Sequence, residues 1–332
     1  MSGRVSEVRA THPPEAPLRP TGDSGMAPRK PEKDIPRTVR FRIFRGSRGA
    51  GLYSEYEVEN EEGMVVLDAV HQIQARSEPD LAVRWNCKAG KCGSCSAEVN
   101  GVPKLMCMTR IDTLDPTRPV SVAPIKAFPH VKDLVADVAW NYEVNKRIPP
   151  FTPAPMTKAE AARGEFRMAQ QDVDRLQEFR KCIECFLCQD VCHVLRDAQK
   201  KHEFFGPRFF IRLAGLDMHP KDDLDRVPMT KHAAGVELCN ITKCCTEVCP
   251  EHIKITDNGI IPMKERVVDR YYDPILVGWR IVSETLTRWF SGRDDEKRGP
   301  GEEALERILE RAEAGTNGAQ APKPPARPPA AK

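Results

Sequence analysis

The sequence predicts an α+β protein in which a small mixed domain precedes a helical one. Residues 38–45 and 53–60 alternate apolar with polar side chains, a pattern typical of strands, whereas residues 64–75 repeat apolar side chains at helical spacing. Beyond a proline-rich segment at residues 147–157, the apolar spacing is helical. Twelve cysteines lie across both halves, and their grouping indicates what the two domains hold.

The first domain, predicted for residues 37–146, begins with two strands and a helix. Val39, Phe41 and Ile43 alternate with arginines in the first strand, and the turn-like residues 46–51 lead into the second. The helix follows, then a loop with three cysteines. The dipeptide Asn-Gly at residues 100 and 101 then predicts a hairpin, because it suits the tight turn between two paired strands.

The second domain, predicted for residues 147–290, begins with the proline-rich linker and continues as helices. Its last helix is amphipathic and carries Trp279 and Trp289. We expect this helix either to contact the membrane or an anchor subunit, or to pack on its own domain. Helices are predicted at residues 170–181, 206–219, 261–272 and 274–290.

Composition excludes several classes of protein. The formal net charge of +3 over 332 residues gives no electrostatic case for binding nucleic acid. No apolar run approaches the roughly 18 residues of a membrane span. The N-terminus lacks the apolar core of a secretory signal, so we expect a cytoplasmic chain whose thiols are not a disulfide framework. Residues 1–36 and 291–332 are rich in proline and charge and are predicted to be disordered tails.

The first cysteine group has the spacing of a plant-type 2Fe–2S ferredoxin. Three thiols lie on one short loop, where Gly90 and Gly93 allow backbone amides to approach the cluster, and the fourth arrives from the far strand of the hairpin. A zinc ribbon needs two C-x2-C pairs, and only one is present here. The predicted 2Fe–2S ligands are Cys87, Cys92, Cys95 and Cys107.

The second group has the C-x2-C-x2-C-x3-C spacing of bacterial ferredoxins, in which the fourth cysteine serves a different cluster. A remote cysteine must then complete the first cluster, and Cys249, which precedes Pro250, meets that need. The predicted 4Fe–4S ligands are therefore Cys182, Cys185, Cys188 and Cys249. The remaining set, Cys192, Cys239 and Cys245, is predicted to hold a third cluster.

The third set is one ligand short of a cubane cluster. A full run starting at Cys239 would place its second cysteine at position 242, which is Thr242. Three ligands suit a 3Fe–4S cluster and leave Cys244 as a spare thiol, which is the interpretation we favour. The alternative makes Cys244 the fourth ligand of a 4Fe–4S cluster.

These motifs resemble the iron–sulfur subunit of succinate dehydrogenase and fumarate reductase, most closely its actinobacterial type. The resemblance covers residues 38–275 and rests on "RWNCKAGKCGSCSAEVNG", "LMCMTR", "CIECFLCQDVCHV", "FGPRF" and "CCTEVCPEHIKITDN". It implies a β-grasp ferredoxin domain followed by an all-α domain like a two-cluster bacterial ferredoxin.

The resemblance also implies a function. Electrons from succinate enter at the FAD of a flavoprotein partner, pass through 2Fe–2S, 4Fe–4S and 3Fe–4S clusters, and reach a quinone beside a membrane-anchor subunit. The implied protein is a peripheral respiratory-chain and tricarboxylic-acid-cycle subunit on the cytoplasmic face of the membrane. Menaquinone is the favoured quinone, and the anchor is a candidate carrier of haem b. The dicarboxylate site is expected on the partner, since the glycine-rich residues 46–51 lack the order of a dinucleotide site.

The sequence departs from the pattern of its relatives at three places. His193 stands where many relatives have proline. Ubiquinone-using relatives carry a tryptophan on the helix that follows, where this chain has "HVLRDAQ", and a histidine where this chain has Asn240. His193, Asn240 and Thr242 are therefore candidate quinone contacts only through their place beside the third cysteine set, and a buried structural role for His193 is the alternative. Other functions that remain open are the reverse reaction, in a quinol:fumarate reductase, and service as an electron-transfer adaptor for another flavoprotein.

Overall fold

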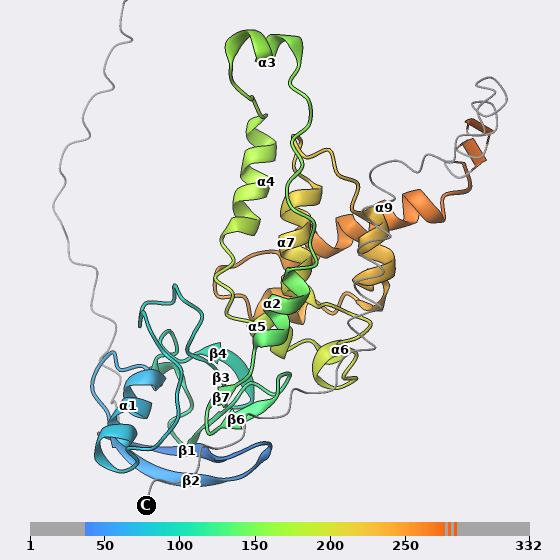
Figure 1. The fold of residues 1–332 in the computed structure, drawn as a ribbon. Coiled ribbons are helices and arrows are strands. Elements are labelled where there is room, and N and C mark those ends of the chain that lie inside the picture. The colour runs from blue at the N-terminus through green and yellow to red at the C-terminus, as the bar shows by residue number, and fades with distance from the viewer. Residues whose placement is uncertain (1–36, 276–277, 280–281, 284–332) are drawn as a thin grey trace, which may run out of the picture. The chain divides into compact units, whose positions relative to one another are not determined.

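The computed structural model describes residues 37–275, 278–279 and 282–283 (Figure 1). The tails predicted for residues 1–36 and 291–332 lie outside the described residues. The described chain contains a mixed sheet followed by helices, so the predicted α+β class is confirmed. The domain limits at residues 37–146 and 147–290 stay predictions.

The sheet is organised around strand β1, Thr38–Ser47, which forms a long antiparallel hairpin with β2, Ala50–Glu59 (Figure 1, blue). On its other side β1 pairs in parallel with β5, Val120–Ala123. Inward-facing side chains of β1, among them Phe41 and Ile43, are fully buried, as their alternation predicts. The other strands are β3, Ser96–Val99; β4, Val102–Leu105; β6, His130–Lys132; and β7, Val135–Ala136, in the order β4-β3-β5-β1-β6-β7.

Helix α1, Val66–Arg76, and the β3–β4 hairpin confirm two local predictions. The apolar face of α1 is buried in the core of the sheet through Leu67, Val70 and Ile73. In the hairpin, Asn100 and Gly101 both have positive φ, the conformation that a tight two-residue turn requires. The hairpin register pairs Ser96 with Leu105, so the cysteines just outside the strands, at positions 95 and 107, lie at the same end.

The second half is helical and packs around α7, Pro207–Asp217. Proline in its first turn starts this helix, which buries Phe209, Phe210 and Leu213 completely. Predicted helices are observed as α4, Gln170–Arg180, and α9, Ile261–Tyr271. The remaining helices are α2, Ala139–Asn145; α3, Lys158–Arg163; α5, Leu187–Asp190; α6, His193–Arg196; and α8, Cys244–Glu247, with short 3-10 or π turns at Ile111–Thr113, Met229–Ala233, Val236–Leu238 and Ile255–Ile260.

The proline-rich linker lies against the helical core. Arg226 is 1% exposed, pairs with Asp222 at 2.9 Å, and donates to the carbonyls of Pro149 and Pro150 at 3.3 and 2.9 Å. A β-bridge also joins Pro153 to Asp222. Residues 147–157 are therefore irregular but fixed by hydrogen bonds.

Buried polar contacts connect the sheet with the helices that follow it. Glu98 of β3 pairs with Arg196 of α6 at 2.9 Å and with Lys126 at 2.8 Å. Asp190 of α5 accepts a hydrogen bond from the amide of Ala127 at 2.9 Å. Both helices flank the end of the second cysteine group, so these contacts hold that group against the sheet.

The helix predicted for residues 274–290 is described only in part. Its described residues are helical, and Ile275, Trp279 and Val282, which are exposed by 78%, 72% and 51%, follow helical spacing. Whether this helix contacts a membrane or its own domain stays an open prediction. Among the described helices, none is both long enough and apolar enough to cross a membrane.

Candidate functional site

The first cysteine loop directs backbone amides at its own sulfurs. The amides of Ala89 and Lys91 donate to the Cys87 Sγ at 3.4 and 3.3 Å, and the amide of Cys87 donates to the Cys92 Sγ at 3.5 Å. Positive φ at Lys88 and at two glycines curls the loop so that these N–H groups converge. A concave array of donors favours a negatively charged group.

The hairpin brings the fourth cysteine of this group beside the third. The amide of Met106 donates to the carbonyl of Cys95 at 3.1 Å, and both Cys95 and Cys107 are buried. Burial raises the pKa of the Cys95 thiol to about 12. Burial also opposes ionisation of Cys92, but hydrogen bonds from Cys87 and Ser94 lower the pKa of that thiol to about 6.

The second cysteine set lines one cavity. Residues far apart in the sequence meet there, because the loop before α5 faces the turn that carries Pro250. Left-handed conformations at Glu184 and Phe186 bend the loop between its cysteines. The four thiols that line the cavity are those of Cys182, Cys185, Cys188 and Cys249.

This cavity is lined mainly by apolar atoms, and two of its thiols, those of Cys185 and Cys188, are buried. Burial raises the pKa of Cys185 to about 12 and that of Cys188 well above its ordinary value, with the neighbouring thiols adding to the effect. Thiols that are so hard to ionise become thiolate ligands when iron replaces the proton. The cavity therefore suits a metal cluster better than free thiolates.

The third set meets in a second cavity, together with the three candidate quinone contacts. Asn240 Nδ2 and His193 Nε2 lie 2.7 Å apart, and the hydroxyl of Thr242 lies 3.4 Å from the Cys244 Sγ. The lining thiols are those of Cys192, Cys239, Cys244 and Cys245. Because Cys244 lines the cavity with the other three, its position is compatible with both interpretations, the spare thiol and the fourth ligand.

The three sets lie in series. The hydroxyl of Ser96, one residue after the first loop, lies 3.0 Å from the carbonyl of Gly93 and 2.7 Å from that of Cys185 in the second loop. Between the second and third sets, Cys245 contributes to the raised pKa of the Cys188 thiol, after burial and the thiols of Cys185 and Cys182. A cluster held by the second set would therefore lie between a cluster held by the first set and one held by the third.

An unsatisfied donor supports the fit of a cluster to the second cavity. Arg208 lines this cavity and is 1% exposed, and its Nε has no hydrogen-bond partner among the described residues. A buried donor without an acceptor is costly, and an anionic sulfur group would supply the acceptor. In the described part of the chain, no three His, Cys, Asp or Glu side chains are arranged to hold a single metal ion.

Sequence reasoning missed three residues of these sites. Arg208 and Ser96 carry no spacing signal that links them to cysteines. Lys264 of α9 donates its Nζ to the carbonyl of Cys239 at 2.5 Å, although 25 positions separate the two residues. An arginine inside the apolar run "GPRFFIRL" was an available signal, since a charge on a buried helix face requires a partner.

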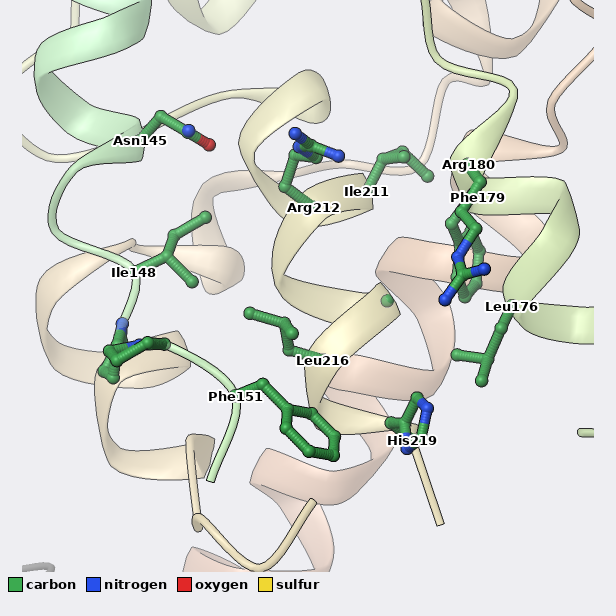
Figure 2. A pocket seen from close by; sticks show the side chains of 13 residues that line it. Asn145, Ile148, Phe151, Leu176, Phe179, Arg180, Ile211, Arg212, Leu216 and His219 are labelled. Carbon is green, nitrogen blue, oxygen red and sulfur yellow. The ribbon is translucent and has the colours of Figure 1, made fainter. Parts of the chain in front are cut away.

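A separate cavity of about 590 Å³ lies between α4, α7 and the proline-rich segment (Figure 2). Figure 2 shows Phe151 beside His219, with ring centroids 4.9 Å apart, and the guanidinium groups of Arg180 and Arg212 on its walls. No cysteine lines this cavity, and we assign no cofactor to it.

Two family models match separate parts of the chain. The 2Fe-2S iron-sulfur cluster binding domain matches residues 40–142, and the 4Fe-4S dicluster domain matches residues 178–253. The first range contains nearly the whole sheet, and the second contains all eight cysteines that line the two cavities.

Known proteins resemble the chain over more than half of its length. A chain of the Mycobacterium smegmatis Sdh1 complex in the apo form is 59% identical with a TM-score of 0.68, over 72% of this chain and 98% of that one. The fumarate reductase iron-sulfur subunit of Mycobacterium tuberculosis is 30% identical over 208 residues, which are 61% of this chain and 81% of that protein. An uncharacterized iron-sulfur protein of Methanococcus maripaludis is 28% identical over 214 residues, or 64% of this chain. The chain spans about two fifths of the length of its methanogen relatives.

Proposed function

The chain belongs to the family of iron–sulfur subunits of succinate dehydrogenase and fumarate reductase, and we propose that it is the electron-transfer subunit of a succinate:quinone oxidoreductase. In this role it holds a 2Fe–2S, a 4Fe–4S and a 3Fe–4S cluster, in that order, between the FAD of a flavoprotein partner and a quinone. When bound, such clusters supply one-electron transfer. The dicarboxylate chemistry belongs to the flavoprotein.

The observation that carries the proposal is the sorting of eight cysteines into two neighbouring cavities. Cys249 lines the cavity of the second group, although it follows Cys188 by 61 positions. Cys192, which ends the second group in the sequence, lines the other cavity with Cys239 and Cys245. Exchange of the fourth cysteine between two clusters is what the spacing of bacterial ferredoxins requires.

In this proposal the protein positions the clusters, keeps water away from the middle one and adjusts their reduction potentials. Amide donors around Cys87 offset negative charge at the first centre, where the thiol is exposed to an incoming partner. The buried Cys185 and Cys188 hold the middle centre away from water. The polar pair of His193 and Asn240 gives the last centre an exposed hydrogen-bonding edge, where we place the quinone.

The remaining partners follow from the same proposal. The subunit lies at the cytoplasmic face of the membrane, held by an anchor subunit that is a candidate carrier of haem b. The apolar face of Ile275, Trp279 and Val282 suits contact with that anchor. Menaquinone is the proposed quinone, because Asn240 and the lack of a tryptophan in "HVLRDAQ" separate this chain from the ubiquinone-using pattern.

Paramagnetic resonance of the oxidised complex tests the proposal. A 3Fe–4S cluster gives a signal in this state, whereas an oxidised cubane cluster gives none. We expect Cys192→Ser and Cys245→Ser to abolish the signal and the matched Cys244→Ser to keep it, with about nine irons per wild-type chain. Loss of the signal in Cys244→Ser would overturn the ligand assignment, and isolation without a flavoprotein would overturn the function.

The direction of the reaction needs a separate assay. The same arrangement serves a quinol:fumarate reductase, because the order of the centres is the same in either direction. Activity of the purified complex, measured with succinate and with fumarate and with menaquinone and ubiquinone analogues, distinguishes the two. A markedly faster fumarate reduction would make the chain a fumarate reductase subunit.

A further inference from the structure

Arg208 is a buried cation in the cavity of the second cysteine set. It is the second residue of α7, and its side chain lines the cavity together with the four thiols. The fold holds its guanidinium in place: Nη1 donates to Asn145 Oδ1 at 2.7 Å, and Nη2 pairs with Glu184 Oε1. Its Nε has no acceptor among the described residues.

We propose that Arg208 is a positioning and tuning residue, which donates its Nε–H to the iron–sulfur group in this cavity and raises the reduction potential of that group. The inference rests on the proposed function, because it requires a cluster between these cysteines. Two independent observations support it. The Arg208 side chain lines the cavity, and its Nε–H has no acceptor among the described residues. Both its terminal nitrogens are already engaged, so the guanidinium plane is fixed and Nε faces none of the described protein acceptors.

The sign of the effect follows from charge. Reduction of the group adds one negative charge, which a nearby cation stabilises and a nearby anion destabilises, and both effects are strong where water is excluded. Hydrogen bonds to cluster sulfurs act in the same direction as the cation. Loss of Arg208 should therefore lower the midpoint potential, whereas loss of the Glu184 charge should raise it.

Arg212 provides a matched control on the same helix. It lies one turn after Arg208 and approaches the same Glu184 carboxylate at 3.6 Å, but it is exposed and does not line the cavity. An arginine removed at this position changes the charge of the same helix and of the same ion-pair network. It does not remove a donor from the cavity.

The test is a redox titration of the purified complex, followed by paramagnetic resonance. We expect the 4Fe–4S midpoint potential to fall in Arg208→Met, to rise in Glu184→Gln and to change little in Arg212→Met, with the 2Fe–2S potential unchanged in all three. An unchanged potential in Arg208→Met with the cluster present would overturn the proposal. Should Arg208→Met fail to fold, Arg208→Lys, which keeps the cation but lacks the Nε donor, is titrated instead, and an unchanged 4Fe–4S potential there would overturn the proposal.

Different measurements would contradict the proposed function and the proposed role of Arg208. Iron and acid-labile sulfide in the wild-type complex report on the clusters, so their absence would contradict the proposed function. Normal iron content in all variants, combined with equal 4Fe–4S potentials, would contradict only the role of Arg208.

Discussion

Replacing Gly93 with alanine should force the first cysteine loop away from the second. Gly93 has a φ of +67°, and a Cβ at this position would lie 2.7 Å from the Cα and 2.8 Å from the amide nitrogen of Cys185. It would also lie 2.8 Å from the carbonyl oxygen of Ile183. All three atoms are backbone, so no side-chain rotation can relieve the contact.

The expected loss of stability in Gly93→Ala has two contributions, one from backbone conformation and one from steric contact. A left-handed conformation costs a residue with a Cβ about 1–2 kcal/mol. Insertion of a methyl group into packed surroundings adds about 1–3 kcal/mol, because the backbone must shift. The free energy of unfolding of Gly93→Ala should thus fall by roughly 2–5 kcal/mol.

Gly101→Ala separates the two parts. Gly101 is in the same domain and has a φ of +77°, but no atom lies within 4 Å of its added Cβ. This variant should therefore lose only the conformational part, and the difference between the two variants measures the contact with Cys185.

The assay combines stability with a magnetic distance. Denaturant unfolding of the purified complex gives the two costs, and the relaxation enhancement between the reduced first and second clusters reports their separation, since magnetic coupling falls steeply with distance. We expect weaker coupling in Gly93→Ala and unchanged coupling in Gly101→Ala. Equal stability of the two variants, with equal coupling, would refute the argument that these loops are in backbone contact.

Three further predictions concern other parts of the chain. Lys264→Met should lower the midpoint potential of the third cluster, because the ammonium group lies against the carbonyl of its ligand loop; an unchanged titration curve would argue against this role. Arg226→Met should lower the free energy of unfolding by about 3–5 kcal/mol, since it strands the buried carboxylate of Asp222. Denaturation midpoints check this, and a loss below about 1 kcal/mol would mean that the pair is not desolvated. Replacing Ile275 and Trp279 together with glutamate should release the subunit from membranes without loss of iron, and full retention in a flotation assay would exclude this helix face as a contact.

Local chemistry in the sequence predicted the parts of the fold that short segments determine. The alternation of Val39, Phe41 and Ile43 indicated the first strand, and the Asn100-Gly101 turn indicated the hairpin, because each signal lies within a few residues. The strand at Val120–Ala123 was not predicted. It is only four residues long, and its pairing with β1 joins positions 79 apart, so no local pattern marks it.

In the candidate site, too, the sequence predicted what short segments determine and not what depends on tertiary packing. Cysteine spacing indicated which thiols belong together, and the cavities of the second and third sets contain those thiols. Spacing did not indicate Arg208, because the first turn of α7 reaches the cavity only through tertiary packing. It also could not decide the role of Cys244, because adjacent residues at the start of the short helix α8 both line the third cavity.

The interleaving of the two cysteine-lined cavities restricts how the protein can mature. The second cavity stays incomplete until Cys249 has been synthesised, and by then every cysteine from Cys192 to Cys245 has been synthesised as well. Neither centre can therefore be loaded from a finished N-terminal half, and the whole stretch between Cys182 and Cys249 must be kept reduced at once. Under the proposed ligand assignment, both of these centres are completed only after Cys245 has been synthesised, whereas all four cysteines of the first group precede residue 108.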